Sequence, residues 1–313
     1  MSTASLFSVP ADSPTISFEL YPPRTPKGER ELPGTVAALA AVDPDFFSVT
    51  YGASGRTRES SGALLEHILT RTDVPAIAHL TCVGASEEDL DGVVRRLLDI
   101  GVRDVLALRG DPPEGEPDWR PHPQGYTTAS ELVQLLRRVE AQRFGTPDGD
   151  GPRPLSIAVA AYPGGTFDAD GVPVVDPTTV QALLAKQAAG ADYAITQVFY
   201  DPASYAAFVA AARAAGVHLP IVPGIIPLTD PRRLRRLETL TGVPVPPALL
   251  AALDEAPTPE ERYRRGLTAS VDLVHGVLAA GAPGLHVYTF NTAGPALDVL
   301  AEAGLRPVPA DTR

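Results

Sequence analysis

Residues 75–109 read PAIAHLTCVGASEEDLDGVVRRLLDIGVRDVLALR. Two short runs rich in apolar and β-branched residues, 75–82 and 104–109, flank a segment, 86–100, whose apolar residues recur at helical spacing. Ser86 is followed by three acidic residues, which is typical of a helix start. The stretch therefore predicts a strand, a helix and a second strand, the unit from which parallel sheets are built.

The same unit recurs along the whole chain. Strands are expected at 15–20, 46–51, 75–82, 104–109, 155–162, 193–199, 221–226 and 285–290. Helices are expected near 30–41, 57–71, 86–100, 127–143, 177–189, 202–215, 230–241 and 294–303, with extra helices at 247–254 and 259–280 before strand eight. No linker divides the chain, and no G-x-G-x-x-G follows a strand. The sequence thus predicts an α/β fold, a single (β/α)8 TIM barrel over 1–313, with residues 1–14 as a flexible N-terminus.

Composition excludes several classes of function. The 313 residues include 26 basic and 38 acidic side chains, for a net charge of −12. This balance argues against nonspecific binding to nucleic acid or to anionic membranes. The single cysteine, Cys82, excludes an internal disulfide. Residues 1–14 lack the pattern of a signal peptide, and no apolar run is long enough to span a membrane, so a cytoplasmic location is expected.

Polar residues interrupt the apolar runs near the expected strand ends, where the chemistry of a barrel collects. Glu19 lies between Phe18 and Leu20, and such apolar neighbours predict a raised pKa, as a general acid requires. An alternative is that Glu19 points into solvent at the barrel rim, and His79 alone is equally consistent with a core histidine. The other polar residues at these strand ends are Thr50, Tyr51, Thr81, Arg109, Asp111, Tyr162, Thr196, Gln197, Tyr288, Thr289 and Asn291.

Other classes of catalysis find little support. His-x-His, His-x-x-x-His and Cys-x-x-Cys patterns are absent, so no metal site is expected. Neither lysine, Lys27 or Lys186, follows an expected strand, and no serine sits in a nucleophile elbow. Acid catalysis on an organic ligand remains, with a cofactor held by loops.

The strand ends together resemble one family, the methylenetetrahydrofolate reductases, over residues 15–308. The resemblance rests on Ser17-Phe18-Glu19, Pro22-Pro23-Arg24, Ser48-Val49-Thr50-Tyr51-Gly52-Ala53, His79-Leu80-Thr81-Cys82, Leu108-Arg109-Gly110-Asp111, Ala160-Ala161-Tyr162-Pro163, Ala194-Ile195-Thr196-Gln197, Pro223-Gly224-Ile225 and His286-Val287-Tyr288-Thr289 with Asn291.

The resemblance implies reduction of 5,10-methylenetetrahydrofolate to 5-methyltetrahydrofolate with electrons from NADH or NADPH. Glu19 matches the general acid that protonates N10 of the folate. Asp111 matches the acid that stabilises developing positive charge, and Gln197 matches an amide that contacts folate and nicotinamide. The implied cofactor-binding residues are Thr50, Tyr51, Ala53, His79, Arg109, Gly110, Ala129, Tyr162 and Lys186.

The sequence departs from the family where FAD would be held. Gly164 and Thr166 replace a Glu and a His, and Thr179, Ala182 and Ala185 replace residues that hold the ribose and phosphates of FAD, whereas Lys186 remains. Each lost charge-assisted hydrogen bond costs about 1.5–3 kcal/mol. We therefore expect that FAD is absent and that the nicotinamide passes its hydride directly to the folate.

A second departure concerns the folate tail. Thr292 replaces an Arg of the family, and Arg233 and Leu237 replace a Gln and a Phe. Arg233 is the candidate substitute, and the expected substrate-binding residues are Gln197, Arg233, Tyr288 and Asn291. Three alternatives remain open: an FAD-dependent ping-pong reductase, a non-catalytic folate-binding barrel, and a reductase of another tetrahydropterin.

Overall fold

A computed structural model describes residues 3–7, 13–23, 25–50, 55–111, 120–145 and 153–307, without the side chains of 55–59. The order of elements is η1 (Thr3–Phe7), β1 (Thr15–Leu20), α1 (Pro26–Ala40), β2 (Phe46–Val49), α2 (Gly55–Arg71), β3 (Ala76–Thr81), α3 (Glu87–Asp99), β4 (Asp104–Leu108), α4 (Ala129–Phe144), β5 (Ser156–Ala161), α5 (Pro177–Ala188), β6 (Tyr193–Thr196), α6 (Pro202–Ala214), β7 (Ile221–Val222), β8 (Gly224–Ile225), α7 (Pro231–Thr241), α8 (Pro247–Asp254), α9 (Pro259–Ala279), β9 (Gly284–Tyr288) and α10 (Ala293–Glu302).

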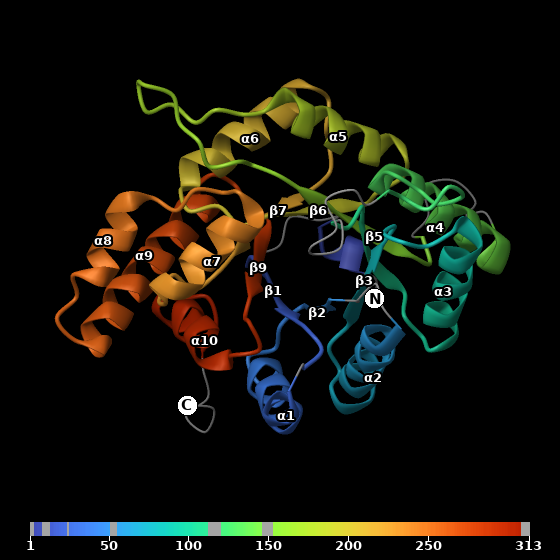
Figure 1. The fold of residues 1–313 in the computed structure, drawn as a ribbon, viewed down its shortest axis with the longest axis horizontal. Coiled ribbons are helices and arrows are strands. Elements are labelled where there is room, and N and C mark those ends of the chain that lie inside the picture. Colours follow the sequence, from blue (N-terminus) through green and yellow to red (C-terminus); the bar gives the residue numbers. More distant parts are fainter. Residues whose placement is uncertain are drawn as a thin grey trace.

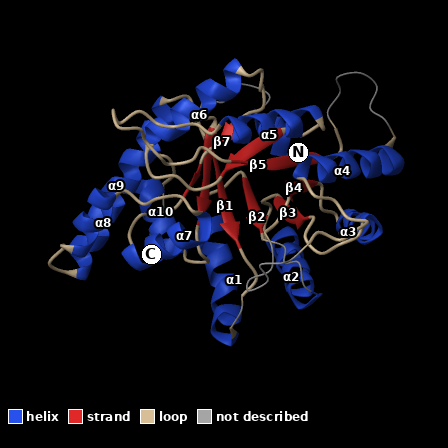
Figure 2. Cartoon of the chain, turned by 45° about the horizontal axis from the view of Figure 1, so that its top comes forward, coloured by secondary structure: helices blue, strands red, loops and turns tan. Residues whose placement is uncertain are grey.

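The strands form one parallel sheet that closes into a barrel. Their order is β7-β6-β5-β4-β3-β2-β1-β9-β8, and the two strands at its ends, β7 and β8, are separated only by Pro223. Helices surround the strands on all sides (Figure 1), and the colours of Figure 2 separate the outer helices from the inner strands. The (β/α)8 barrel expected from the sequence is confirmed, with α8 and α9 inserted before its last strand.

Pro223 explains why the seventh strand is split where the sequence predicted one run over 221–226. Proline has no N–H to donate to a neighbouring strand. Its carbonyl still accepts a hydrogen bond of 2.9 Å from the backbone N–H of His286. The strands also come close here, because a Cβ on Gly224 would lie 2.2 Å from the carbonyl oxygen of Thr196. Only glycine permits the barrel to close at this point.

Successive side chains of a strand point alternately towards the helices and into the barrel, so the apolar residues form two clusters. In β1, Phe18 and Leu20 are fully buried against the helices, whereas Ser17 and Glu19 face the barrel interior. A second apolar cluster fills the interior of the barrel, and its members are Phe46, Ile77, Leu106, Ala158, Tyr193, Ile195 and Val222. The catalytic face therefore lies above a packed floor.

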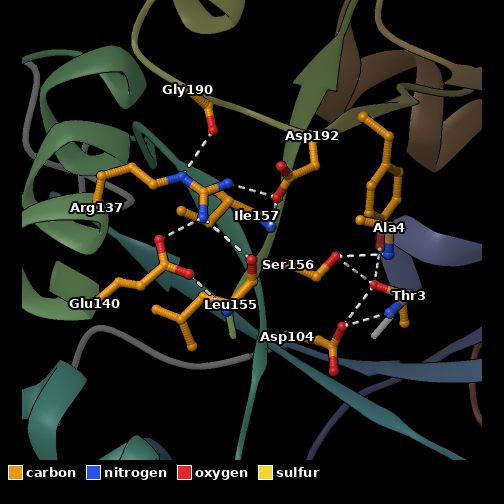
Figure 3. A network of polar contacts seen from close by, with 11 residues as sticks. Thr3, Ala4, Asp104, Arg137, Glu140, Leu155, Ser156, Ile157, Gly190 and Asp192 are labelled. Carbon is orange, nitrogen blue, oxygen red and sulfur yellow. Dashed lines mark hydrogen bonds and ion pairs between the residues drawn. The ribbon is translucent and has the colours of Figure 1, made fainter. Parts of the chain in front are cut away.

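Within the segment 1–14, expected to be flexible, residues 3–7 instead pack against the barrel. Thr3–Phe7 form a short 3-10 helix, and Thr3 is only 1% exposed. Thr3 donates from its backbone N–H and its hydroxyl to Asp104, at 2.8 and 2.7 Å, and contacts Ser156 and Tyr193 (Figure 3). All three partners lie at the beginnings of strands, so η1 plugs the end of the barrel opposite the catalytic face.

Beside the plug, a buried guanidinium joins three elements, as the left half of Figure 3 shows. Arg137 of α4 donates to Glu140, to Asp192 before β6, and to the carbonyls of Leu155 and Gly190. Every one of these acceptors is within 3.1 Å. Because the charges are paired and hydrogen-bonded, the network fixes how α4 sits on the starts of β5 and β6.

Candidate active site

A cavity of about 490 Å³ opens at the carboxyl ends of the strands. Its size is typical of a site for a small organic ligand. The described residues that line it come from all eight βα units and are Glu19, Tyr21, Thr50, His79, Leu106, Leu108, Arg109, Gly110, Asp111, Ala160, Tyr162, Ile195, Gln197, Val198, Leu237, Leu240, Thr241, Tyr288, Thr289 and Phe290.

Glu19 lies at the centre of a buried polar cluster. Its Oε1 accepts a 3.2 Å hydrogen bond from the hydroxyl of Thr50. Its Oε2 lies 3.9 Å from Nε2 of His79 and 4.0 Å from Nε2 of His286. The Nε2 of His79 is buried and has no hydrogen-bond partner among the described residues. The carboxylate therefore lies within 4.0 Å of two imidazoles.

The expected raised pKa of Glu19 is wrong. Burial by itself raises the pKa of this carboxyl, but the imidazoles of His286 and His79 and the hydroxyl of Thr50 outweigh burial and hold the pKa below its ordinary value. The physical reason is strand alternation: Phe18 and Leu20 point away from Glu19, and the groups that surround it come from other strands.

The histidines of this cluster differ in their surroundings. Burial lowers the pKa of His79 to about 4, although the charge of Glu19 acts in the opposite direction, so His79 is neutral at pH 7. Ser17 donates its hydroxyl proton to Leu285 at 3.1 Å, so its oxygen accepts from Nδ1 of His286 at 2.9 Å. Nε2 of His286 lies 3.2 Å from the hydroxyl oxygen of Ser48.

His286 was not among the site residues expected from the sequence. The signal that points to it is its spacing, because His286 precedes Tyr288 by two residues on β9 and so faces the same side of the sheet. The alternation that places Tyr288 in the cavity therefore places His286 inside the barrel below it.

Gln197 and Asp111 reach the same cavity from other strands. The amide oxygen of Gln197 accepts a 2.8 Å hydrogen bond from the N–H of Val198, while its amide nitrogen has no partner among the residues that the structure describes. Asp111 is exposed at the mouth. Gly110 has a φ of +80°, and a Cβ there would lie 2.5 Å from the side chain of Val83, so this turn at the cavity requires glycine.

Arg109 lines one wall of the cavity, and Lys186 lies behind Ala160 and Tyr162 of that wall without lining the cavity itself. The Lys186 ammonium is buried, donates to the carbonyl of Ala160 at 2.7 Å and lies 5.4 Å from the ring centre of Tyr162. Burial, together with the charge of Arg109, lowers the pKa of Lys186 to about 8. An ammonium with unused donors beside a guanidinium suits an anionic ligand.

Four other residues were expected at the site: Ala129, Tyr51, Ala53 and Arg233. Ala129 is buried in the first turn of α4 and does not line the cavity. Tyr51 and Ala53 lie outside the described residues. Arg233 also does not line the cavity directly, but its guanidinium stacks 4.5 Å from the ring centre of Phe290, which does.

Asn291 and Tyr288 use their polar atoms within the protein. The Asn291 amide accepts from the N–H of Tyr21 at 3.0 Å and donates to the carbonyl of Tyr21 at 2.7 Å. The Tyr288 hydroxyl donates to the carbonyl of Thr196 at 2.7 Å. Asn291 therefore joins the ends of β1 and β9, and the ring of Tyr288, rather than its hydroxyl, faces the cavity.

Known proteins similar to this chain agree on its family. The family model described as "Methylenetetrahydrofolate reductase" matches residues 7–304. A 5,10-methylenetetrahydrofolate reductase of Pectobacterium carotovorum is 34% identical over 301 residues, 93% of this chain and 91% of that protein. Methylenetetrahydrofolate reductase (NADH) 1 of Zea mays is 31% identical over 94% of this chain, which spans half of the length of that plant relative.

A solved structure of similar fold is an uncharacterised protein of Clostridium thermocellum described as binding 5-methyl-5,6,7,8-tetrahydrofolic acid. Its TM-score is 0.60 at 14% identity, with 93% of this chain and 94% of that chain covered. At this identity the likeness shows the fold alone. Among the described residues no helix is long and apolar enough to cross a membrane. The family model and the bacterial relative establish that the chain belongs to the methylenetetrahydrofolate reductase family of oxidoreductases.

Proposed function

We propose that this protein reduces 5,10-methylenetetrahydrofolate to 5-methyltetrahydrofolate by direct hydride transfer from NADH or NADPH, without a flavin. The observation that carries the proposal is the single cavity that gathers Glu19, Asp111 and Gln197 at the carboxyl ends of three strands. A carboxyl acid, a second carboxylate and an amide are the groups that ring opening and hydride transfer on a pterin require.

Glu19 donates the proton in the first step. Its proton moves to N10 of the folate, the bond from N10 to the methylene carbon breaks, and the electron pair on N5 forms an iminium cation. In the ligand-free protein the Glu19 side chain is 22% exposed. A bound folate covers that remaining surface, and further loss of solvent raises the pKa of the carboxyl towards that of an acid that is protonated at neutral pH.

Asp111 and Gln197 act on the second step. The hydride of the nicotinamide attacks the methylene carbon, which yields the methyl group and the oxidised nicotinamide. The carboxylate of Asp111 at the mouth stabilises positive charge on the pterin, and the free amide nitrogen of Gln197 orients a ligand carbonyl. The overall reaction consumes one hydride and one proton, and solvent returns the proton to Glu19.

FAD does not suit the residues beside this cavity. The loop after β5 offers Gly164 and Thr166, and the hydroxyl of Thr179 is bonded to the carbonyl of Asp176 at 2.8 Å. Among the residues that the structure describes, Lys186 and Arg109 are the cations beside Tyr162. A pyrophosphate of FAD thus lacks the further charged partners expected of a tightly held prosthetic group.

The test is the fate of deuterium carried by stereospecifically labelled NADH. Direct transfer places the label in the methyl group of the product without loss, and the initial-rate lines for the two substrates intersect. A flavin relay exchanges the hydrogen with solvent, which washes the label out and gives parallel lines. Loss of label together with a flavin absorption band in the purified protein would establish the ping-pong alternative.

A further inference from the structure

A second hollow of about 280 Å³ adjoins the active-site cavity, between the loop after β5 and the chain after α7. We call it the β5–α7 hollow. Its described lining residues are Tyr162, Gly164, Gly165, Thr166, Val174, Asp176, Thr179, Gln197, Thr241, Gly242, Val243 and Pro244. Tyr162, Gln197 and Thr241 also line the active-site cavity, so the two spaces are continuous.

The walls of the β5–α7 hollow suit a flat, uncharged ring. The ring of Tyr162 is 44% exposed, Val174 is 48% exposed, and Val243 and Pro244 lie opposite the loop after β5. Aromatic and aliphatic faces bind heteroaromatic bases by stacking and dispersion. The volume of about 280 Å³ admits a bicyclic base.

Charge excludes an anionic occupant. Asp176 is the only charged side chain among the described residues that line the hollow. Its carboxylate accepts from the N–H and the hydroxyl of Thr178, both at 2.8 Å, which holds it in place as the cap of α5. A phosphate or the glutamate tail of a folate would meet a negative charge here and no positive one.

The positive charges near the hollow lie outside its lining, at Lys186 and Arg109 and at Arg233. Lys186 lies 5.4 Å from the ring centre of Tyr162, which lines both spaces, and Arg109 lines the active-site cavity. Arg233 is on the first turn of α7, whereas Thr241 ends that helix, so about 12 Å separates the two along its axis. The cation at Arg233 suits the folate tail, which leaves the hollow to the other substrate.

We propose that the β5–α7 hollow binds the adenine of the nicotinamide dinucleotide, with its pyrophosphate beside Lys186 and Arg109 and its nicotinamide beside Gln197. This inference rests on the proposed function, in which NADH or NADPH enters the cavity itself. It adds a coenzyme preference. The 2′-phosphate of NADPH lies next to the adenine, so it would face Asp176 without a cation, and NADH is the preferred donor.

Filling the hollow tests the adenine position. A Cβ on Gly165 would lie 2.9 Å from Val243 and more than 4 Å from Glu19 and Gln197, so Gly165→Val fills the hollow from the side of Val243. The dissociation constant of NADH should rise about tenfold or more, the loss expected for one stacked base. Reduced nicotinamide mononucleotide, which lacks the adenine, should bind wild type and variant equally, and so should 5-methyltetrahydrofolate.

Adding a positive charge tests the coenzyme preference and does not depend on Gly165→Val folding. Val174→Arg places a guanidinium in the hollow and should improve the affinity for NADPH relative to NADH by about tenfold. The matched control is Val172→Arg, on the same loop, 55% exposed and outside the lining. The control should leave the ratio unchanged.

Two results would overturn the inference. One is that Gly165→Val weakens the binding of 5-methyltetrahydrofolate alone, or weakens the binding of NADH and of the mononucleotide equally. The other is that Val174→Arg and Val172→Arg change the NADPH preference alike. Both readouts are binding titrations, so they are separate from the deuterium experiment. If direct hydride transfer is wrong, the deuterium experiment shows loss of label in the wild-type protein, independently of how the two variants bind the coenzyme.

Discussion

At the scale of single residues, Glu19 shows what a sequence can and cannot tell. Its place at a strand end identified it as a candidate acid, and the structure places it at the centre of the cavity. Its pKa could not be predicted, because the groups that lower it are Thr50, His79 and His286, which lie 31 to 267 positions away in the chain. The role of Asn291 could not be predicted for the same reason, because its amide is hydrogen-bonded to the backbone of Tyr21, which is 270 positions away in the chain.

Replacing the proposed acid tests its role. Glu19→Gln keeps the shape and the hydrogen bond from Thr50 but has no proton to donate to N10. We expect the turnover number to fall by about 10²–10⁴-fold, with the affinity for 5-methyltetrahydrofolate nearly unchanged. Glu29→Gln, on the exposed side of α1, is the matched control and should be silent. Near-normal turnover by Glu19→Gln would remove Glu19 from the mechanism and favour another proton donor.

Lys186 predicts a pH dependence of coenzyme binding. Its pKa of about 8 in the free protein means that the ammonium is charged below that pH and neutral above it. The attraction for a pyrophosphate is therefore present below pH 8 and is lost as the pH rises through that value. We expect the dissociation constant of NADH to increase above pH 8 in wild type and to stay flat in Lys186→Met, as measured by fluorescence titration.

The same variant should be more stable than wild type at neutral pH. Lys186 binds its proton less tightly in the folded chain than in the unfolded chain, so the buried charge costs stability below pH 8. Its removal should raise the free energy of unfolding by about 1–3 kcal/mol. Lys27→Met, at the exposed lysine of α1, is the control. A pH profile for NADH that persists in Lys186→Met would assign the titration to another group.

At the scale of elements, local signals predicted most boundaries. Helices that begin with Asp-Pro, such as α6 and α7, start within one residue of their expected positions, because the aspartate caps the helix and proline fits its first turn. The first helix begins four residues before its expected start, at Pro26, and β6 ends at Thr196, three residues before its expected end. The seventh strand differs most. Its apolar run predicted one strand, and Pro223 within it, which has no N–H, divides it into β7 and β8.

Helix α7 shows how one element divides the site between two ligands. Leu237, Leu240 and Thr241 line the active-site cavity along its length, Arg233 stacks on Phe290 near its start, and Gly242 ends it beside the β5–α7 hollow. The sequence located Arg233 as a departure from the family. It could not show the hollow, because the facing wall comes from the loop after β5, some 70 residues earlier.

At the scale of the whole molecule, the barrel has a sealed end and a reactive end. Parallel strands place every carboxyl end on one face, so the buried polar cluster and the cavity lie together, while η1 and the apolar floor close the other end. A five-residue segment such as Thr3–Phe7 has no periodicity from which a sequence can predict order. Its conformation depends on Asp104, Ser156 and Tyr193, which are more than 100 residues away.

The plug should matter for stability and not for catalysis. Thr3→Val removes the hydroxyl that donates to Asp104 at 2.7 Å and lies within hydrogen-bond distance of Ser156 and Tyr193. Burial already raises the pKa of Asp104, and the bonds from Thr3 oppose that rise. We expect the variant to lose about 1–3 kcal/mol of unfolding free energy at pH 7, the cost of a buried polar group left without a partner.

The sign of the pH effect makes this prediction specific. Because the folded chain holds the Asp104 proton more tightly than the unfolded chain does, protonation at acidic pH removes part of the cost of burying the carboxylate. The deficit of Thr3→Val relative to wild type should therefore shrink as the pH falls towards the pKa of Asp104. Thr70→Val, at an exposed threonine of α2, should stay within about 0.5 kcal/mol of wild type in urea titrations. If Thr3→Val matched Thr70→Val in stability, or changed the affinity for NADH, η1 would not be a structural plug remote from the site.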